Sequence, residues 1–200
     1  TFAIPLFFGL ILIEFFYGVI TKQNNYRIND AITSMSLGLI SRFVPILGLG
    51  FQYVVYKAVA EHYNLKLLSG EEIWVWVTAF ILYDICYYWM HRIHHEIKVF
   101  WATHVVHHHG EEFNLATALR QTSTGFLWKW VFFLPLFIIG IPPQMYVTVA
   151  GLNLVYQFWV HTEHIGRLGF LEYILVTPSN HRGHQAQNED YLDANYGGVF

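Results

Sequence analysis

The chain has 200 residues, of which 54% are hydrophobic and only 12% are charged, with a formal net charge of -3 at pH 7. An ordinary soluble domain carries about 25% charged residues, so this composition indicates a membrane protein. The aromatic content of 18% agrees with that, because Trp and Tyr favour membrane interfaces. The small net charge and the lack of a basic patch give no argument for a nucleic-acid partner.

The single cysteine, Cys86, excludes an internal disulfide framework and every cysteine-based zinc or iron–sulfur site. The length is typical of one domain, and we expect residues 1–200 to form a single membrane domain. The sequence starts at Thr1 and shows no cleavable signal with a basic leader and a small-residue cleavage site. We therefore expect a longer parent protein that has been trimmed at one or both ends.

The first apolar stretch, Phe2 to Ile20, has the length of a membrane-spanning helix, about 20 residues. Its one charge is Glu14. A carboxylate is costly there unless it faces protein or is protonated, so Glu14 marks a buried helix face or, as the alternative, a functional residue. The next apolar region, Ala31 to Ala60, is too long for one simple span and is broken by Arg42 and Pro45. It predicts two successive helices.

A third span begins at Ile73 and carries polar residues at its far end. Further on, Phe126 to Ile139, a Gly-Ile-Pro-Pro turn, and Gln144 to Val160 predict a helical hairpin through the membrane. The predicted fold is therefore all-α, a polytopic membrane helical bundle of about four to five membrane helices.

Histidines are concentrated at the end of the third span. Seven of the chain's 12 histidines lie between Asp84 and Gly110. On a helix, residues four apart share a face, so His91 lies over His95, and His104 presents toward His107 and His108 in the same way. Two short helical segments of this kind can converge on a metal ion. Imidazole binds zinc, iron, copper or nickel, so the histidines alone do not name the element.

Two polar stripes lead to the histidines. Asp84, Tyr88, His91 and His95 follow one another at helical spacing on the third span. Metal-bound histidines usually donate their second ring nitrogen to a carboxylate or carbonyl, so Asp84 is a candidate supporting residue.

The second stripe, Asn153, Gln157 and His161, opens onto another histidine. Glu163 is the second carboxylate that we consider as a supporting residue, although on an ideal helix it points elsewhere. His164 follows His161 within one turn. A polar segment near residue 180 adds His181 and His184, and it must fold back to join the rest.

The patterned histidines number eight. A structural zinc takes four ligands and a catalytic one takes three plus water, so eight histidines indicate two metals with open positions. Haem is a poorer fit. A membrane haem needs one axial histidine from each of two places, so adjacent histidines such as His107 and His108 would be superfluous. We expect His94 and His109 to be surface or supporting residues and His62 to have no special role. The proposed ligands are His91, His95, His104, His107, His108, His161, His181 and His184.

The distribution of basic residues predicts the orientation of the bundle. With about five crossings, one side collects Lys22, Arg27, Arg92, Lys98, Arg120, Arg167 and Arg182, while the other holds mainly Lys66 and several glutamates. By the positive-inside rule, the histidine side is cytoplasmic. A carrier would need ionisable residues along a path through the bilayer, and here they collect at one side, which disfavours transport.

The segments HRIHHE, WATHVVHHH and NHRGHQ resemble the histidine boxes of the fatty acid hydroxylase and sterol desaturase superfamily of membrane di-metal oxygenases. Within it, NLATALRQ, YQFWVHTE, LGFLEYILVTPSNHR and NYGG are most similar to the alkylglycerol monooxygenase branch. The resemblance implies an integral membrane protein of the bacterial inner membrane or endoplasmic reticulum. It also implies two iron ions, with zinc possible in their place, and the use of O2 to hydroxylate a lipid C–H bond.

For this branch the resemblance further implies an external reductant, tetrahydrobiopterin, and a C–H bond beside an ether oxygen, whose hydroxylation releases an aldehyde. A sterol, fatty acid or carotenoid desaturase or hydroxylase has the same metal chemistry and stays open, as does a degenerate, non-redox metal-binding relative.

The chain departs from the family in its last box, where the form H-x-x-H-H ends here in Gln185. An amide carbonyl suits iron less well than imidazole does. We therefore expect one metal ion to be bound tightly and the other weakly, unless His164 replaces the missing ligand.

Overall fold

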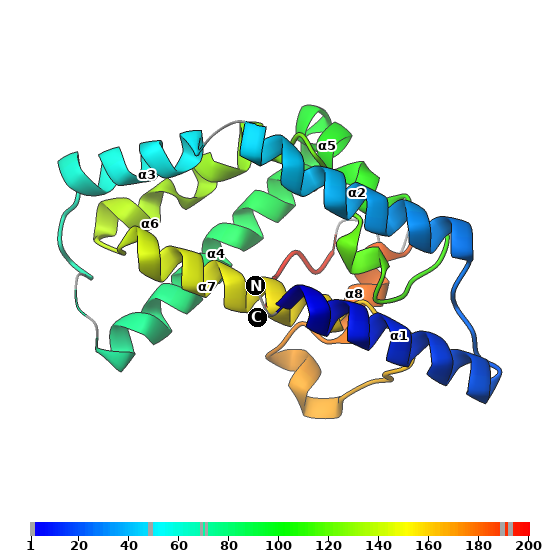
Figure 1. Ribbon diagram of the computed structural model, residues 1–200. Coiled ribbons are helices and arrows are strands. Elements are labelled where there is room, and N and C mark those ends of the chain that lie inside the picture. Colours follow the sequence, from blue (N-terminus) through cyan, green and yellow to red (C-terminus); the bar gives the residue numbers. More distant parts are fainter. Residues whose placement is uncertain (1–2, 48–49, 69, 71, 189–190, 192–193) are drawn as a thin grey trace.

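The computed structural model describes residues 3–47, 50–68, 70, 72–188, 191 and 194–200 (Figure 1). These residues form helices and connecting segments, with no strand among them. The α-helices are α1 (Ala3–Thr21), α2 (Ile28–Leu47), α3 (Phe51–His62), α4 (Ile73–Glu96), α5 (Lys98–His108), α6 (Leu134–Ile139), α7 (Pro143–Trp159) and α8 (Pro178–Gln185). Four short 3-10 helices join them, namely η1 (Thr117–Leu119), η2 (Gly125–Leu127), η3 (Lys129–Phe133) and η4 (Gly169–Tyr173).

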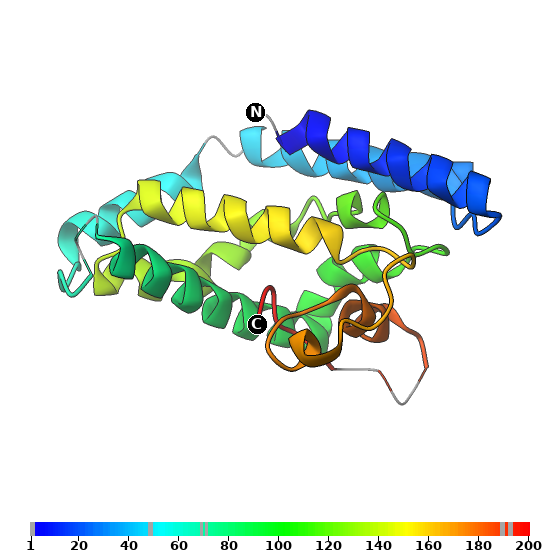
Figure 2. The ribbon, with the colours of Figure 1, turned by 90° about the horizontal axis from the view of Figure 1, so that it is seen from below.

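Helix α7 lies at the centre of the arrangement. It packs against α4 and α3 on one side, and the stacked rings of Phe7 and Phe158 join it to α1 at 4.1 Å between centroids. In Figure 2 the α1–α2 pair, α7 and α4 follow one another as three layers, with α8 beside the ends of α4 and α7. The histidine-bearing ends of α4, α5 and α7 therefore meet at one end of the bundle (Figures 1 and 2).

Two apolar clusters hold these layers together. The larger one joins α3, α4, α6 and α7 and includes the fully buried side chains of Val75, Phe137 and Val149. The smaller one joins α1 and α2 to the segment around Ala116 and to Phe158 on α7. The larger cluster packs on the first half of α7, through Met145 and Val149, and the smaller one packs near its polar end, through Phe158. Together they fix the positions of the helices that carry histidines.

In the described part of the chain, two helices, with spans Ile4–Thr21 and Ile73–Glu96, are long and apolar enough to cross a membrane. The exposed surface of α4 carries Val77, Ile81, Ile85 and Trp89 at four-residue intervals, all more than 40% exposed. A helix of a water-soluble protein turns such a stripe inward and its polar residues outward. Here the polar Asp84 and His91 are buried instead. This inverted pattern is typical of a helix surrounded by lipid.

The predicted hairpin arm from Phe126 to Ile139 is not one continuous α-helix. The chain forms η2 and η3 first, and α6 begins only at Leu134. Pro135, in the first turn of α6, explains this start, because proline has no N–H and its ring clashes with the carbonyl four residues earlier. The second arm forms α7 nearly as predicted. Within the described residues two helices have spanning length, so the expected count of four to five membrane helices is not confirmed and stays a prediction.

Glu14 lies on a buried face of α1, as its position in an apolar helix predicts. Its carboxylate accepts hydrogen bonds from the hydroxyls of Tyr26 and Thr162 and, at 2.8 Å, from the backbone N–H of Leu115. Thr162 directly follows His161, so this carboxylate connects α1 to the histidine end of the bundle.

Replacing Glu14 with alanine is expected to destabilise the fold, because three donors, two of them buried and one half-buried, then lack an acceptor. Each such donor costs about 1–3 kcal/mol, so the total loss is about 3 kcal/mol or more. Thermal unfolding in detergent measures the effect, with the exposed Glu61→Ala as the control. Equal midpoints for the two variants would show that Glu14 does not hold α1 in place.

Candidate metal centre

The structure gathers all eight predicted histidines into two neighbouring groups. His91, His95, His104, His108 and His184 form one, hereafter the five-histidine group, and His107, His161 and His181 form the other, the three-histidine group. Within each group one ring nitrogen per residue lies within 4.8 Å of those of the others. The groups adjoin, since the rings of His181 and His184 are 5.3 Å apart.

Local chain geometry explains how α4 and α5 supply most of these imidazoles. Helix α4 ends at Glu96, and the extended backbone of Ile97 turns the chain before α5 begins at Lys98. The two helices then pack against each other. As a result, His91 and His95 on α4 face His104 and His108 on α5, each pair being spaced by four residues on one helix face.

Two other segments complete the groups. Helix α7 ends just before His161, and α8 brings His181 and His184 on one face. Thr177 caps the N-terminus of α8 by accepting from the N–H of Asn180. Arg182 donates to the carbonyls of Thr162 and Ile165 at 3.0 and 2.8 Å, and so ties α8 to the segment that follows α7.

The distances between ring nitrogens match those around a metal ion. His91 Nε2 and His108 Nε2 lie 3.0 and 3.2 Å from His104 Nε2. In the other group, His161 Nε2 lies 3.3 Å from His107 Nε2 and 2.9 Å from His181 Nε2. Ligand atoms bound at about 2.1 Å to one ion are separated by about 3.0–3.4 Å, for octahedral to tetrahedral geometry.

Hydrogen bonds behind the rings determine which nitrogens carry protons. His107 Nδ1 lies 3.0 Å from the carbonyl of Arg120, and His161 Nδ1 lies 2.8 Å from that of Gln157. A carbonyl only accepts, so both Nδ1 atoms carry the hydrogen. In neutral rings the Nε2 atoms then present lone pairs to each other at 3.3 Å. Two lone pairs at this distance repel unless a cation lies between them.

The burial of the rings keeps them neutral. Desolvation lowers the pKa of His107 to about 4, and burial together with neighbouring imidazoles also lowers the pKa of His104, His161 and His181. Metal ions bind the deprotonated form of imidazole, so a lowered pKa leaves these rings ready for binding at neutral pH. The donor set therefore fits the metal ions that the sequence predicts.

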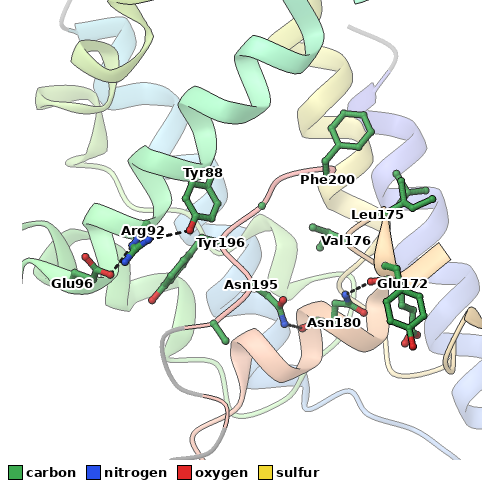
Figure 3. A pocket seen from close by; sticks show the side chains of 14 residues that line it. Tyr88, Arg92, Glu96, Glu172, Leu175, Val176, Asn180, Asn195, Tyr196 and Phe200 are labelled. Carbon is green, nitrogen blue, oxygen red and sulfur yellow. Dashed lines mark hydrogen bonds and ion pairs between the residues drawn. The ribbon is translucent and has the colours of Figure 1, made fainter. Parts of the chain in front are cut away.

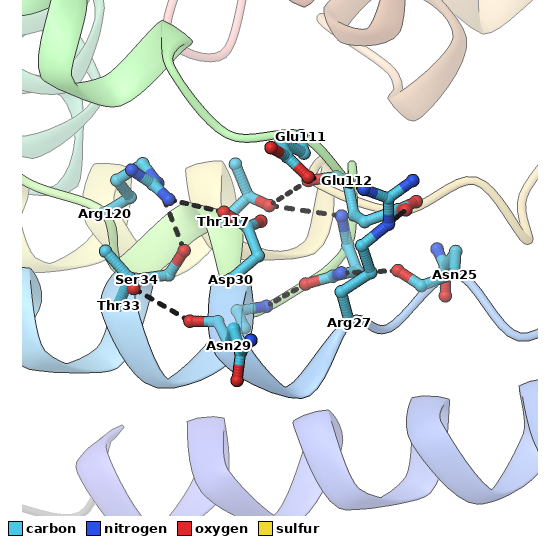
Figure 4. A network of polar contacts seen from close by, with 12 residues as sticks. Asn25, Arg27, Asn29, Asp30, Thr33, Ser34, Glu111, Glu112, Thr117 and Arg120 are labelled. Atoms are coloured by element: carbon cyan, nitrogen blue, oxygen red, sulfur yellow. Dashed lines mark hydrogen bonds and ion pairs between the residues drawn. The ribbon is translucent and has the colours of Figure 1, made fainter.

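Arg120 anchors the carbonyl behind His107 to α2. Its guanidinium donates to Asp30 at 2.6 Å and to Ser34 at 3.2 Å, and the Arg120–Asp30 ion pair is almost fully buried (Figure 4). The sequence gives no sign of this role, because the group that contacts the ring is a backbone carbonyl. The same holds for Tyr196 and Ala194, whose carbonyls lie 3.0 and 2.7 Å from the Nδ1 atoms of His91 and His184.

The two carboxylates considered from the sequence lie outside both groups. Asp84 is buried and accepts from Asn153 at 2.8 Å and from the backbone N–H groups of Val199 and Phe200 at 2.9 Å. These contacts join the two polar stripes predicted from the sequence. Glu163 is exposed and lines an open pocket of about 800 Å³.

The remaining histidines also lie outside the groups. His94 is buried, bonds through Nδ1 to the carbonyl of Met90, and packs on Phe100, with its ring 6.0 Å from that of His104. It is therefore an interior residue rather than a surface one. His109 and His62 are exposed, in line with the sequence prediction for them.

Gln185, at the end of α8, lines the same open pocket as His108, and its buried amide nitrogen has no hydrogen-bond partner among the described residues. His164 packs edge-on against Tyr17 of α1 at 5.0 Å. It does not occupy the place of a fourth member in the three-histidine group of the described chain.

Known proteins resemble this chain over most of its length. The family model described as fatty acid hydroxylase matches residues 76–200. The alkylglycerol monooxygenases of Homo sapiens and Danio rerio are 42% and 41% identical to it over 98% of its residues, and that of Caenorhabditis elegans is 32% identical over 94%. The chain spans 44% of the human protein and 37% of the nematode one.

No solved structure gives a significant match. The family model nevertheless covers more than half of the chain and includes every histidine of the two groups. The chain belongs to the fatty acid hydroxylase family.

Proposed function

We propose that this chain is the metal-binding part of a membrane di-iron monooxygenase that hydroxylates a lipid C–H bond. The observation that carries the proposal is the pair of facing Nε2 lone pairs of His107 and His161, together with the convergence of three further Nε2 atoms in the adjoining group. Family membership supports it. The five-histidine group would hold one iron and the three-histidine group the other.

The bound iron would supply the redox chemistry that activates O2. One oxygen atom enters the C–H bond and the other leaves as water, with two electrons and two protons from an external reductant. The chain's own contribution is geometric: carbonyls of Arg120, Gln157, Tyr196 and Ala194 fix the ring orientations. Burial excludes bulk water from six of the eight imidazoles, those of His91, His104, His107, His161, His181 and His184. Asp84 and Glu163 would support the site without binding a metal.

The relatives named alkylglycerol monooxygenase favour an ether glycerolipid as substrate. Tetrahydrobiopterin as reductant is what the resemblance of the sequence to that branch implies. The outward apolar stripe on α4 favours an integral membrane protein and a substrate that arrives from the bilayer. The excess of Lys and Arg on the histidine side favours a cytoplasmic location of the metal centre.

Alanine at His107 is expected to remove the metal of the three-histidine group, and alanine at His108 that of the five-histidine group. Each variant should lose about one metal ion per chain together with lipid oxidation, because each group loses a nitrogen donor from a small set. Elemental analysis of the purified full-length protein measures this, with the exposed His62→Ala as the matched control. A full metal complement in both variants would refute the assignment.

Replacing Gln185 with histidine is expected to raise the affinity for the more weakly held of the two metals. The three-histidine group has fewer donors than its neighbour, and Gln185 stands where the family carries a histidine. Metal titration of both forms tests this. If neither stoichiometry nor affinity changes, position 185 does not face the metals.

The substrate prediction is tested with purified full-length protein, O2, tetrahydrobiopterin and an alkylglycerol. Hydroxylation beside the ether oxygen gives a hemiacetal that breaks down to a fatty aldehyde and glycerol, so aldehyde should appear only when O2 is present. Product formation from sterols or acyl chains alone would instead favour a desaturase or hydroxylase of the same superfamily.

A further inference from the structure

The segment Ala194–Phe200, hereafter the strap, runs past the five-histidine group. Figure 3 shows it passing Tyr88 of α4, with the Tyr196 ring beside Tyr88 at 6.0 Å between centroids. The backbone of the strap forms hydrogen bonds with two histidines of the five-histidine group. The carbonyl of Tyr196 accepts from His91 Nδ1 at 3.0 Å, and the carbonyl of Ala194 accepts from His184 Nδ1 at 2.7 Å. Both of these histidines belong to the five-histidine group.

The far end of the strap is held by Asp84. One carboxylate oxygen accepts from the N–H of Val199 and the other from that of Phe200, both at 2.9 Å. Asn153 on α7 donates to the same carboxylate at 2.8 Å, and Asp84 is only 3% exposed. Charged groups form stronger hydrogen bonds than neutral ones, so a buried carboxylate is a firm anchor for two adjacent N–H groups.

Close packing keeps the strap in this place. A Cβ atom added at Gly198 would lie 2.6 Å from Asp84 Oδ1 and 3.1 Å from Asn153 Nδ2. Any side chain there would push the backbone away from its anchor. The carbonyl of Val199 also accepts from the N–H of Val176 at 2.8 Å, which connects the strap to the segment before α8.

We propose that Asp84 acts as a positioning residue through the strap: by anchoring residues 198–200, it places the carbonyls of Tyr196 and Ala194 behind His91 and His184. This inference rests on the proposed metal site. The sequence suggested a direct contact between the Asp84 carboxylate and a histidine, whereas here Asp84 acts on the histidines indirectly, through the backbone of the strap. Each carbonyl accepts the Nδ1–H hydrogen bond of its histidine and so fixes the tautomer of the ring. The Nε2 atom of each ring then keeps the lone pair that would bind the metal.

Two members of the three-histidine group are held by segments other than the strap, and the strap comes near the third, His181, through the hydrogen bond from Asn195 Nδ2 to the carbonyl of Asn180 at 3.4 Å. His107 is held by the carbonyl of Arg120, and His161 is held by Gln157 within the last turn of α7. Loosening the strap should therefore weaken metal binding by the five-histidine group and leave metal binding by the three-histidine group unchanged. General destabilisation of the fold would weaken both.

The experiment follows Zn²⁺ release from the full-length protein, loaded with two equivalents in detergent, to a coloured chelator. His108→Ala and His181→Ala identify the release phases of the five- and three-histidine groups. Gly198→Ala and Asp84→Asn are the strap variants. Gly151→Ala is the matched control, because a Cβ there meets nothing within 4 Å and the residue lies close to Asn153 on α7.

Both strap variants should speed release from the five-histidine group by about 10- to 100-fold, the usual effect of losing support behind a metal ligand. Release from the three-histidine group should stay at the wild-type rate, which also shows that the variants are folded. If both phases accelerate equally, or neither does, the strap has no positioning role although the metal site stands. If the wild-type protein retains no Zn²⁺, the proposed function itself fails.

Discussion

Neutral imidazoles with converging lone pairs are stable in a buried site only if a cation lies between them, and the rest of this structure depends on that constraint. His107 and His161 face each other through unprotonated nitrogens because each commits its only ring hydrogen to a backbone carbonyl. Protonating them would relieve the repulsion, but burial lowers the pKa of both. Metal binding would resolve the conflict, because the facing Nε2 lone pairs would then bind the cation.

Support for the rings comes from three separate parts of the chain. The carbonyls behind them belong to Arg120, to Gln157 in α7, and to Ala194 and Tyr196 in the strap. Arg120 is held by its buried ion pair with Asp30 on α2, and the strap is held by Asp84 on α4. Glu14 adds a link from α1 to Thr162. The few buried charged groups of this apolar chain are therefore concentrated around the metal centre.

Much of the centre could be predicted from the sequence, because helical spacing is local. The four-residue intervals between His91 and His95, and between His104 and His108, place each pair on one helix face whatever the rest of the fold. The stripe from Asn153 to His161 follows by the same reasoning. The apolar length of α1 and α4 likewise identifies them as helices of membrane-spanning length.

Other features were not predictable, since they depend on contacts between distant residues. Backbone carbonyls exist at every position, so nothing in the sequence distinguishes those of Arg120 and Tyr196. The helical spacing places Asp84 on the face of His91 but does not reveal that the strap, more than 100 residues away, takes its hydrogen bonds. Pro135 could have indicated from the sequence that an α-helix begins near Leu134. Nothing in the sequence indicated the 3-10 helices that precede it. The number of membrane crossings also depends on packing, which hydropathy does not describe.

X-ray absorption at the metal edge of the purified full-length protein tests the central claim most directly. The account predicts two metal ions per chain, with a first shell dominated by nitrogen at about 2.0–2.1 Å and the outer-shell scattering of imidazole rings. Removing His107 should reduce the metal content to about one ion and leave the imidazole signal of the five-histidine group. A folded, metal-free protein, or a shell made mainly of oxygen or sulfur, would contradict the account.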